Sequence, residues 1–514
     1  MLLPLMGFSQ DSENVSLFGQ FNRGDTRYSG SWAYIDLENR QEYALLGAST
    51  GTAVYSIDNQ PITELGFIPG PTSNWREITV LGDYAYVTTE GSGMGEGMQI
   101  IDLSNLPDTI SLVNTYTETF TTGHIIQRDI YSEAPYLYIM GVCGNCGVNI
   151  LDVTDPINPQ EISTYSPGYY IHDAHIKGDY LYASAFFEGT IDIVDISDKT
   201  SPTLVAQIET TGGNTHSAWT TEDDKHLIIS LEKDGLPARI WNIEDLSNLS
   251  EVATYTANLA SLTHNPYVRG DFTFFSHNTE GLRVVDTKDP CVPVEVGFFD
   301  TFEGQSGGFS GLWSACPYFP SGKIIGGNRE DGLYVWTFND ASAGRFYATV
   351  TDESSQEIIP NATVFIQKVD TTLSPDLSGV YKFGALPGIF RVEVSADGYE
   401  TILQDIPIES GDSLVINFPL QPTSVGLFDL APHLPTLNIS PNPFTEFTVL
   451  DLGTFENASY LRVFNTFGQL VRTENVVGGN YHIMDRENLE RGVYIFMVYT
   501  SDNKLIGNQK VVCD

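Results

Sequence analysis

Residues that can bind metals or move protons lie close together in the stretch YYIHDAHIKGDYLYAS, from Tyr169 to Ser184. His172, Asp173 and His175 lie within four successive positions, just before an alternating pattern that predicts a β-strand. His175 follows His172 by three residues, so in a strand the two side chains point to opposite faces. The stretch could therefore form a metal site, a catalytic site or only the polar start of a buried strand.

A different type of segment recurs along the chain. Clear copies are MQIIDLSNLPDTISLVNTY, VNILDVTDPINPQEISTY, IDIVDISDKTSPTLVAQI, ARIWNIEDLSNLSEVATY and LRVVDTKDPCVPVEVGFF. One polar position repeats every 43 to 51 residues, at Ser56, Asp102, Asp152, Asp195, Asn242, Asp286 and Thr337. This spacing, with apolar residues at period 2, is typical of β-propeller blades with four strands each. We therefore predict an all-β fold, with a seven-bladed β-propeller over residues 11–338.

Two local features of the repeat have physical explanations. The Asp at the end of the third strand is expected to accept backbone N–H groups of the following turn. The seventh unit ends at LYVWTFND without a fourth strand, whereas residues 14–22 resemble the fourth strands of other units. We expect residues 14–22 to complete blade seven, because a ring closed by both ends of the chain has no open sheet edge.

Aligned on this repeat, the inner strands begin at Trp32, Arg76, His124, His172, His216, His264 and Trp313. Inner strands line the channel of a propeller, so the four histidines are expected to surround one end of it. The candidate site comprises His124, His172, Asp173, His216, His264, Arg76 and Glu77. Such side chains predict a divalent metal, either zinc or calcium. Two alternatives stay open: each imidazole could donate to a carbonyl of the neighbouring blade, or the metal could serve only as a structural staple.

Composition excludes several classes of function. Among 514 residues, 25 Lys+Arg stand against 66 Asp+Glu, which gives a net charge of −41. This excess repels nucleic acid phosphate, so no nucleic acid partner is expected. No apolar stretch is long enough to predict a transmembrane helix, and the chain lacks a GxSxG, P-loop or HExxH motif.

Several ordered motifs carry a family resemblance. WREITVLGDYAYVTTE, GMQIIDLSNL, GYYIHDA, LTHNPYVRGDFTFF and GLWSACPYFPSGKIIGG resemble the LVIVD-repeat propeller of the choice-of-anchor B family. The resemblance covers about residues 30–338. It implies a surface domain that is shared among different C-terminal anchors, and it supplies no defined reaction.

Two further modules follow, and each is expected to be a small β-sandwich. Residues 345–420 resemble the carboxypeptidase regulatory-like domain of transthyretin type, on IPNATV and the LPG turn. After a linker at 421–436, residues 437–514 resemble the type A C-terminal sorting domain of the type IX secretion system. The residues that carry this second resemblance are Pro441, Asn442, Pro443, Gly468, Gly492 and Tyr494. It implies that the type IX secretion machinery exports the protein to the outer surface of a Bacteroidetes-type cell, or beyond it.

The N-terminus and the cysteines agree with export. Residues 1–10 look like the remnant of a signal peptide. In an oxidising compartment, the expected disulfides are Cys143–Cys146 and Cys291–Cys316.

The first functional hypothesis is a secreted or surface-anchored, non-enzymatic propeller that binds an extracellular protein or glycan. The rival hypothesis is a metal-dependent hydrolase or lyase that acts at the channel mouth.

Overall fold

The computed structural model of the chain describes residues 11–93, 95–142, 146–423, 436–455, 457–476 and 479–514. The predicted signal-peptide remnant (1–10), most of the predicted linker (421–436) and Cys143 lie outside the described residues. The described residues form an all-β structure whose single helix is the short 3-10 helix η1 (Gln367–Val369). No helix in this part of the chain is long and apolar enough to span a membrane.

The chain divides into two compact units. The first contains the residues up to Asp397 together with Thr401–Leu420. The second contains Gly398–Glu400 and Gln421–Asp514. The first unit therefore holds the repeats and also the module predicted at 345–420.

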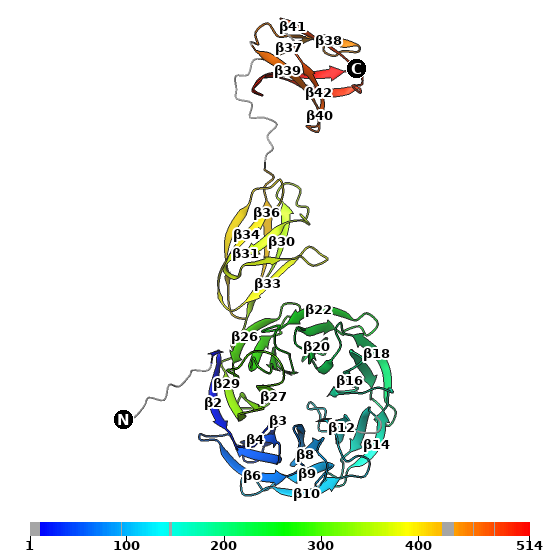
Figure 1. Cartoon of the computed structure of the whole chain (residues 1–514), viewed down its shortest axis with the longest axis vertical. Coiled ribbons are helices and arrows are strands. Elements are labelled where there is room, and N and C mark those ends of the chain that lie inside the picture. Colours follow the sequence, from blue (N-terminus) through cyan, green and yellow to red (C-terminus); the bar gives the residue numbers. More distant parts are fainter. Residues whose placement is uncertain (1–10, 94, 143–145, 424–435, 456, 477–478) are drawn as a thin grey trace, which may run out of the picture. The chain divides into compact units, whose positions relative to one another are not determined.

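The described residues between 12 and 338 form seven antiparallel sheets, of which six have four strands and one has five. In the list that follows, the innermost strand of each sheet is named first (Figure 1). The sheets are β3 (Tyr28–Asp36), β4 (Gln41–Ala48), β5 (Gly51–Ser56), β6 (Thr63–Pro69); β7 (Arg76–Leu81), β8 (Tyr84–Thr89), β9 (Met98–Asp102), β10 (Ser111–Tyr116); β11 (Ile125–Gln127), β12 (Tyr136–Met140), β13 (Val148–Asp152), β14 (Gln160–Tyr165); β15 (Asp173–Lys177), β16 (Tyr180–Ala185), β17 (Thr190–Asp195), β18 (Thr203–Glu209); β19 (Thr215–Thr220), β20 (His226–Leu231), β21 (Ala238–Asn242), β22 (Ser250–Tyr255); β23 (Asn265–Arg269), β24 (Phe272–Ser276), β25 (Leu282–Asp286), β26 (Val294–Phe299), β1 (Ser12–Glu13); and β27 (Leu312–Cys316), β28 (Lys323–Asn328), β29 (Gly332–Phe338), β2 (Val15–Phe21).

The innermost strands close a ring. They contact one another in the order β3, β7, β11, β15, β19, β23 and β27, and β27 contacts β3 again. Figure 1 shows the sheets around a common centre. Because each sheet is covered by a neighbour on either side, middle strands are buried on both faces, as the successive residues Leu45 and Leu46 illustrate.

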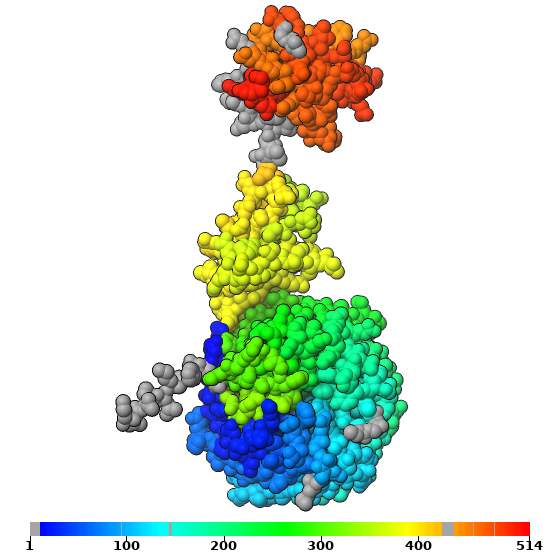
Figure 2. All heavy atoms as spheres, in the orientation of Figure 1, coloured from blue at the N-terminus to red at the C-terminus, as the bar shows by residue number. Residues whose placement is uncertain are grey.

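The expected strand at residues 14–22 is β2, and it pairs antiparallel with β29 from Val15↔Phe338 to Phe21↔Leu333. Figure 2 shows these N-terminal residues in dark blue, beside the last sheet of the ring. Both ends of the ring thus meet in one sheet, so the first and last strands protect each other's edges. β1 adds a further strand outside β26, which the sequence had not indicated.

Where an Asp ends the third strand, its side chain caps the next turn, as predicted. Asp102 accepts the Ser104 N–H at 2.8 Å and Asp195 accepts the Ser197 N–H at 2.8 Å. Asp286 accepts the Lys288 N–H at 3.1 Å. The recurrence of this residue therefore has a structural explanation.

The next module consists of two sheets, β33–β30–β36 and β32–β31–β34–β35. Its strands are β30 (Gly344–Asp352), β31 (Thr363–Ile366), β32 (Thr371–Leu373), β33 (Tyr381–Ala385), β34 (Gly388–Ser395), β35 (Ile402–Ile408) and β36 (Ser413–Leu420). It is joined to the ring by a buried ion pair of 2.8 Å between Arg345 and Asp286.

The second unit also contains two sheets, β37–β38–β41 and β40–β39–β42–β43. Its strands are β37 (Asn438–Ser440), β38 (Phe447–Asp451), β39 (Ala458–Asn465), β40 (Leu470–Asn475), β41 (Tyr481–Asp485), β42 (Gly492–Thr500) and β43 (Leu505–Cys513). A separate apolar core, with Leu461 and Phe496 at its centre, stabilises them.

The predicted Cys291–Cys316 disulfide is wrong, because both residues are free thiols. Cys316 is fully buried on the inner strand β27, whereas Cys291 lies in the turn between β25 and β26, where its N–H bonds to Asp289. The number of residues between two cysteines does not show how far apart they lie in the fold. The predicted pairing of Cys143 with Cys146 cannot be described, since Cys143 lies outside the described residues.

Candidate metal centre

The four predicted histidines start from equivalent positions. The backbone N–H of His124 donates to Met140 O at 2.9 Å, and that of His172 donates to Ser184 O at 2.8 Å. The N–H of His264 donates to Ser276 O at 3.0 Å, and His216 lies on β19 itself. The start of each inner strand is thus anchored to the end of the second strand of its sheet, which places all four side chains at one end of the ring.

The four imidazoles form a continuous arc. Ring centroids are 4.4 Å apart from His124 to His172, 4.3 Å from His172 to His216 and 4.2 Å from His216 to His264. Trp313 continues the arc at 4.1 Å from His264, and Trp75 lies 6.4 Å from His124 at the other end. The structure therefore brings together the four histidines that the repeat alignment had placed at equivalent positions.

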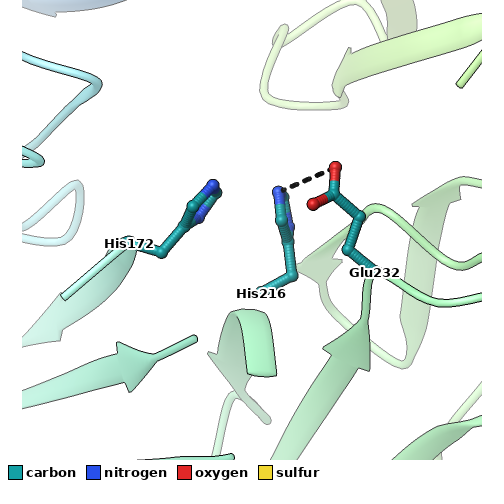
Figure 3. Close-up of side chains that lie close together, drawn as sticks. All are labelled: His172, His216 and Glu232. Carbon is teal, nitrogen blue, oxygen red and sulfur yellow. Dashed lines mark ion pairs between the residues drawn. The ribbon is translucent and has the colours of Figure 1, made fainter. Parts of the chain in front are cut away.

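A carboxylate outside the predicted set completes the cluster. Glu232 Oε1 lies 3.7 Å from His216 Nε2 and 3.6 Å from His264 Nε2. One donor atom each of His172, His216 and Glu232 lies within 4.8 Å of the other two. Figure 3 shows the two rings and the carboxylate around a common space.

The separations suit a cation better than a direct contact. Two ligands that are each 2.1 Å from a tetrahedral metal lie about 3.4 Å apart. Distances of 3.6 and 3.7 Å are too long for a strong hydrogen bond, and they are close to this ligand-to-ligand value.

The hydrogen bonding of His216 prepares its other nitrogen for a ligand. His216 Nδ1 donates to the carbonyl oxygen of His264 at 2.9 Å. With the proton on Nδ1, the lone pair of Nε2 points toward Glu232. The neighbouring-blade hydrogen bond and the metal site are therefore compatible, since each uses a different nitrogen.

Burial keeps the imidazoles neutral. It lowers the pKa of His172, His216 and His264 well below the ordinary value, and neighbouring imidazoles lower it further. Burial also raises the pKa of Glu232 to about 7, against the attraction of Arg329. Neutral imidazoles are the form that binds metals.

His124 belongs to the arc but has its own partner. Its Nδ1 lies 2.7 Å from Glu90 Oε1. This hydrogen bond with His124 lowers the pKa of Glu90 against the effect of burial. The pair lines the same cavity of about 290 Å³ as His172, Glu232 and Trp313.

Two predicted acids lie in the strands beneath this arc. Glu77 Oε1 accepts a hydrogen bond from Trp313 Nε1 at 3.3 Å, and burial raises its pKa to about 8. Asp173 Oδ1 accepts the N–H of Ala174 at 2.7 Å, and burial raises its pKa to about 6. Neither belongs to the group of converging metal donors found among the described residues.

Arg76 does not point into the site, contrary to the prediction. Its Nε donates to Ala48 O at 3.0 Å and its Nη2 donates to Pro71 O at 2.6 Å. The guanidinium of Arg76 therefore forms its hydrogen bonds between the first two sheets of the ring. Trp32, which was aligned with the histidines, packs 5.9 Å from Tyr318 and lines a different cavity.

The residues that were missed share one position in the repeat. Glu90 directly follows β8, Glu232 follows β20 and Arg329 follows β28. All three line the cavity. Aligning the residue that follows the second strand of each repeat would have identified these three residues from the sequence.

The sorting-motif residues hold together the second unit. Asn442 donates to Lys510 O at 2.9 Å and accepts the Val512 N–H at 2.8 Å, which ties its loop to β43. On either side of it, Pro441 O accepts the Thr448 hydroxyl, and Pro443 precedes the buried Phe444.

The other three sorting-motif residues lie at turns and strand ends. Gly468 has a φ of 75° in the turn after β39, a conformation that favours glycine. Gly492 opens β42 opposite Cys513, and the Tyr494 hydroxyl donates to Glu490 O at 2.9 Å.

Comparison with family models identifies three kinds of segment. LVIVD repeats match at residues 74–117, 170–210 and 264–301. A carboxypeptidase regulatory-like domain matches at 346–421, and a secretion system C-terminal sorting domain matches at 438–513. No curated protein is similar enough to count as a match. The sorting domain is the signal of the type IX secretion system, so the protein is exported by that machinery to the cell surface or the extracellular space.

Proposed function

We propose that this protein is an exported binding protein of the choice-of-anchor B type, whose seven-bladed β-propeller binds its ligand at a divalent metal centre. The propeller comprises residues 11–338, a transthyretin-type β-sandwich follows at 345–420, and a sorting β-sandwich follows at 437–514. The closed contacts of the seven inner strands support the propeller, and the three LVIVD matches agree with it.

The convergence of His172, His216 and Glu232 carries this proposal. His172 and His216 are buried and Glu232 is partly buried. His172 and Glu232 line a cavity together with Phe309, of which 52% is exposed. Zinc is favoured over calcium, because imidazole nitrogen is a good ligand for zinc, whereas calcium prefers oxygen. His264 Nε2 also lies 3.6 Å from Glu232 Oε1, although His264 is outside the group of donors that lie within 4.8 Å of one another.

One observation favours a second candidate, a metal-dependent hydrolase or lyase. The hydrogen-bonded pair of Glu90 and His124 borders the same cavity as the metal donors. A carboxylate–imidazole pair beside a metal with an open position could act as a general base.

The proposal is tested on the full-length protein by inductively coupled plasma mass spectrometry after loading with zinc and desalting. We expect one zinc per chain in the wild type and a loss of at least tenfold in affinity for the His172→Ala, His216→Ala double variant. His226→Ala is the control, since His226 lies on β20 outside the cluster. If the wild type keeps its fold and takes up no zinc, the imidazoles serve only to connect strands, and the proposal is wrong.

The two candidate functions are separated by Glu90→Gln. A binding protein retains its affinity for zinc and for its ligand in this variant. An enzyme retains zinc but loses at least a hundredfold in kcat, because its base is removed.

A further inference from the structure

The cavity contains a buried positive charge that is attracted to Glu232 but forms no ion pair at contact distance among the described residues. Arg329 follows β28, is 7% exposed and lines the cavity together with Glu232 and Trp313. Its guanidinium carbon lies 4.4 Å from the centre of the Trp313 ring. Among the described residues, no carboxylate forms an ion pair with it, and its buried Nε has no hydrogen-bond partner.

The position of Arg329 is fixed by its backbone. Its N–H donates to Gly311 O at 2.9 Å, and its carbonyl accepts the N–H of Tyr28 at 3.2 Å. A guanidinium that is stacked on an indole has already lost much of its rotational freedom. An acceptor that enters the cavity therefore meets a preorganised donor.

Burying a charge without a hydrogen-bonded partner is costly. Other buried arginines of the first unit have stronger hydrogen bonding: Arg76 donates to two carbonyl oxygens, although its Nη1 has no partner, and Arg345 pairs with Asp286. Arg329 differs from them, because its free donors line a cavity rather than a packed interface. The partner that offsets the cost is therefore expected to come from a ligand.

The surroundings restrict the charge and shape of this ligand. Glu90 and Glu232 border the cavity, so an anion with two charges is repelled more strongly than an anion with one. Trp75, Trp313 and Phe309 offer aromatic surface, and the volume of about 290 Å³ admits only a small group. The large negative charge of the whole protein also disfavours polyanions.

We propose that this cavity binds a small monocarboxylate with a flat or apolar body, whose carboxylate is held by Arg329 while its body lies against Trp75 and Trp313. The inference deepens the proposed function, on which it rests, because it places the ligand in the cavity of the metal centre. The chemical group that is recognised is the carboxylate, whether it is free or ends a longer molecule.

The test uses isothermal titration calorimetry on the zinc-loaded full-length protein with benzoate, benzamide and phenyl phosphate. Benzamide has the same shape as benzoate without the charge, and phenyl phosphate adds a second charge. We expect benzoate to bind at least tenfold more tightly than either, since a hydrogen bond between a guanidinium and a carboxylate is stronger than one to a neutral amide. Equal binding of benzoate and benzamide would overturn the proposal, as would tighter binding of phenyl phosphate.

Arg329→Gln provides the second arm, and Arg27→Gln is its matched control. Arg27 pairs with Glu330 at 2.8 Å, with 41% of its side chain exposed, so this control removes a nearby positive charge outside the cavity. We expect Arg329→Gln to weaken benzoate binding at least tenfold, and Arg27→Gln to change it less than twofold. Should Arg329→Gln fail to fold, the comparison of the three probes on the wild type still decides the question.

Zinc analysis of the same samples distinguishes the two proposals. If zinc binds and benzoate does not, the carboxylate assignment is wrong and the metal centre stands. If no zinc binds but benzoate binds through Arg329, the metal centre is wrong and the carboxylate assignment stands. In the first case, Arg329→Gln is expected to retain its zinc.

Discussion

The ion pair between Arg345 and Asp286 connects the ring to the module at residues 344–420. The side chains of the two residues are 3% and 2% exposed, and Arg345 Nη2 lies 2.8 Å from Asp286 Oδ1. Asp286 Oδ2 also accepts the N–H of Ala343 at 2.9 Å. We expect Asp286→Ala to detach β30 from the ring, because it leaves a buried guanidinium without its carboxylate.

The expected loss of stability depends on the hydrogen bonds that Arg345 keeps after the substitution. Removing one partner of a buried ion pair costs about 3–5 kcal/mol. Arg345 keeps the carbonyl oxygens of Val292 and residue 286 as acceptors, at 3.2 Å or less. The cost is therefore expected at the lower end, near 3 kcal/mol, which is about a hundredfold in the local opening equilibrium.

Hydrogen exchange measured by mass spectrometry tests this expectation, because it reports local opening in a protein of several domains. Peptides from β30 should exchange about a hundredfold faster in Asp286→Ala, while those from β16 stay unchanged. Asp195→Ala is the matched control: Asp195 has the same place in its repeat and caps the same kind of turn, without an arginine partner. Equal effects of the two variants on β30, or unchanged exchange in Asp286→Ala, would refute the reasoning.

Three further predictions concern the ring. Burial raises the pKa of Glu77 from 4.5 to about 8, so the wild type should lose stability as the pH rises between these values. The Tm of Glu77→Gln should depend less on pH than the Tm of the wild type. Equal slopes of Tm against pH in the two proteins would contradict the buried carboxyl. Deletion of residues 11–22 removes β2 from the sheet of β29 and should lower Tm, whereas an unchanged Tm would show that this pairing contributes nothing. Gly281→Ala should lower Tm too, because its φ is 75° and a Cβ would lie 2.2 Å from Phe299 O; Gly178→Ala, with a φ of 61° and open space for a Cβ, is the control, and an equal loss would exclude the clash as the cause.

The repeat made much of the site predictable. A period of 43 to 51 residues with alternating apolar positions indicates which residue opens each inner strand. His172, His216 and His264 were found in this way, because equivalent backbone positions in a closed ring converge on one end of it.

Residues whose role depends on side-chain direction were not predictable. Arg76 opens its strand as the histidines do, yet its longer side chain reaches the carbonyl oxygens of Ala48 and Pro71. Glu232 directly follows β20 and lies outside the inner strands, so only the fold shows that its carboxylate joins the histidines. The Cys291–Cys316 pairing failed for a related reason, since an inner strand and an outer turn of neighbouring sheets do not meet.

The sequence by itself determined the strand period, the turn-capping Asp residues, the order of the modules and the export signal. These properties depend on residues that are close along the chain, where strand alternation and turn chemistry act directly. The tertiary structure alone decided that Glu232 faces the imidazoles, that Arg329 forms no ion pair among the described residues, and that Arg345 pairs with Asp286. Those relations depend on distances between separate sheets, which arise only when the ring closes and burial fixes both the directions of side chains and the cost of leaving a charge unpaired.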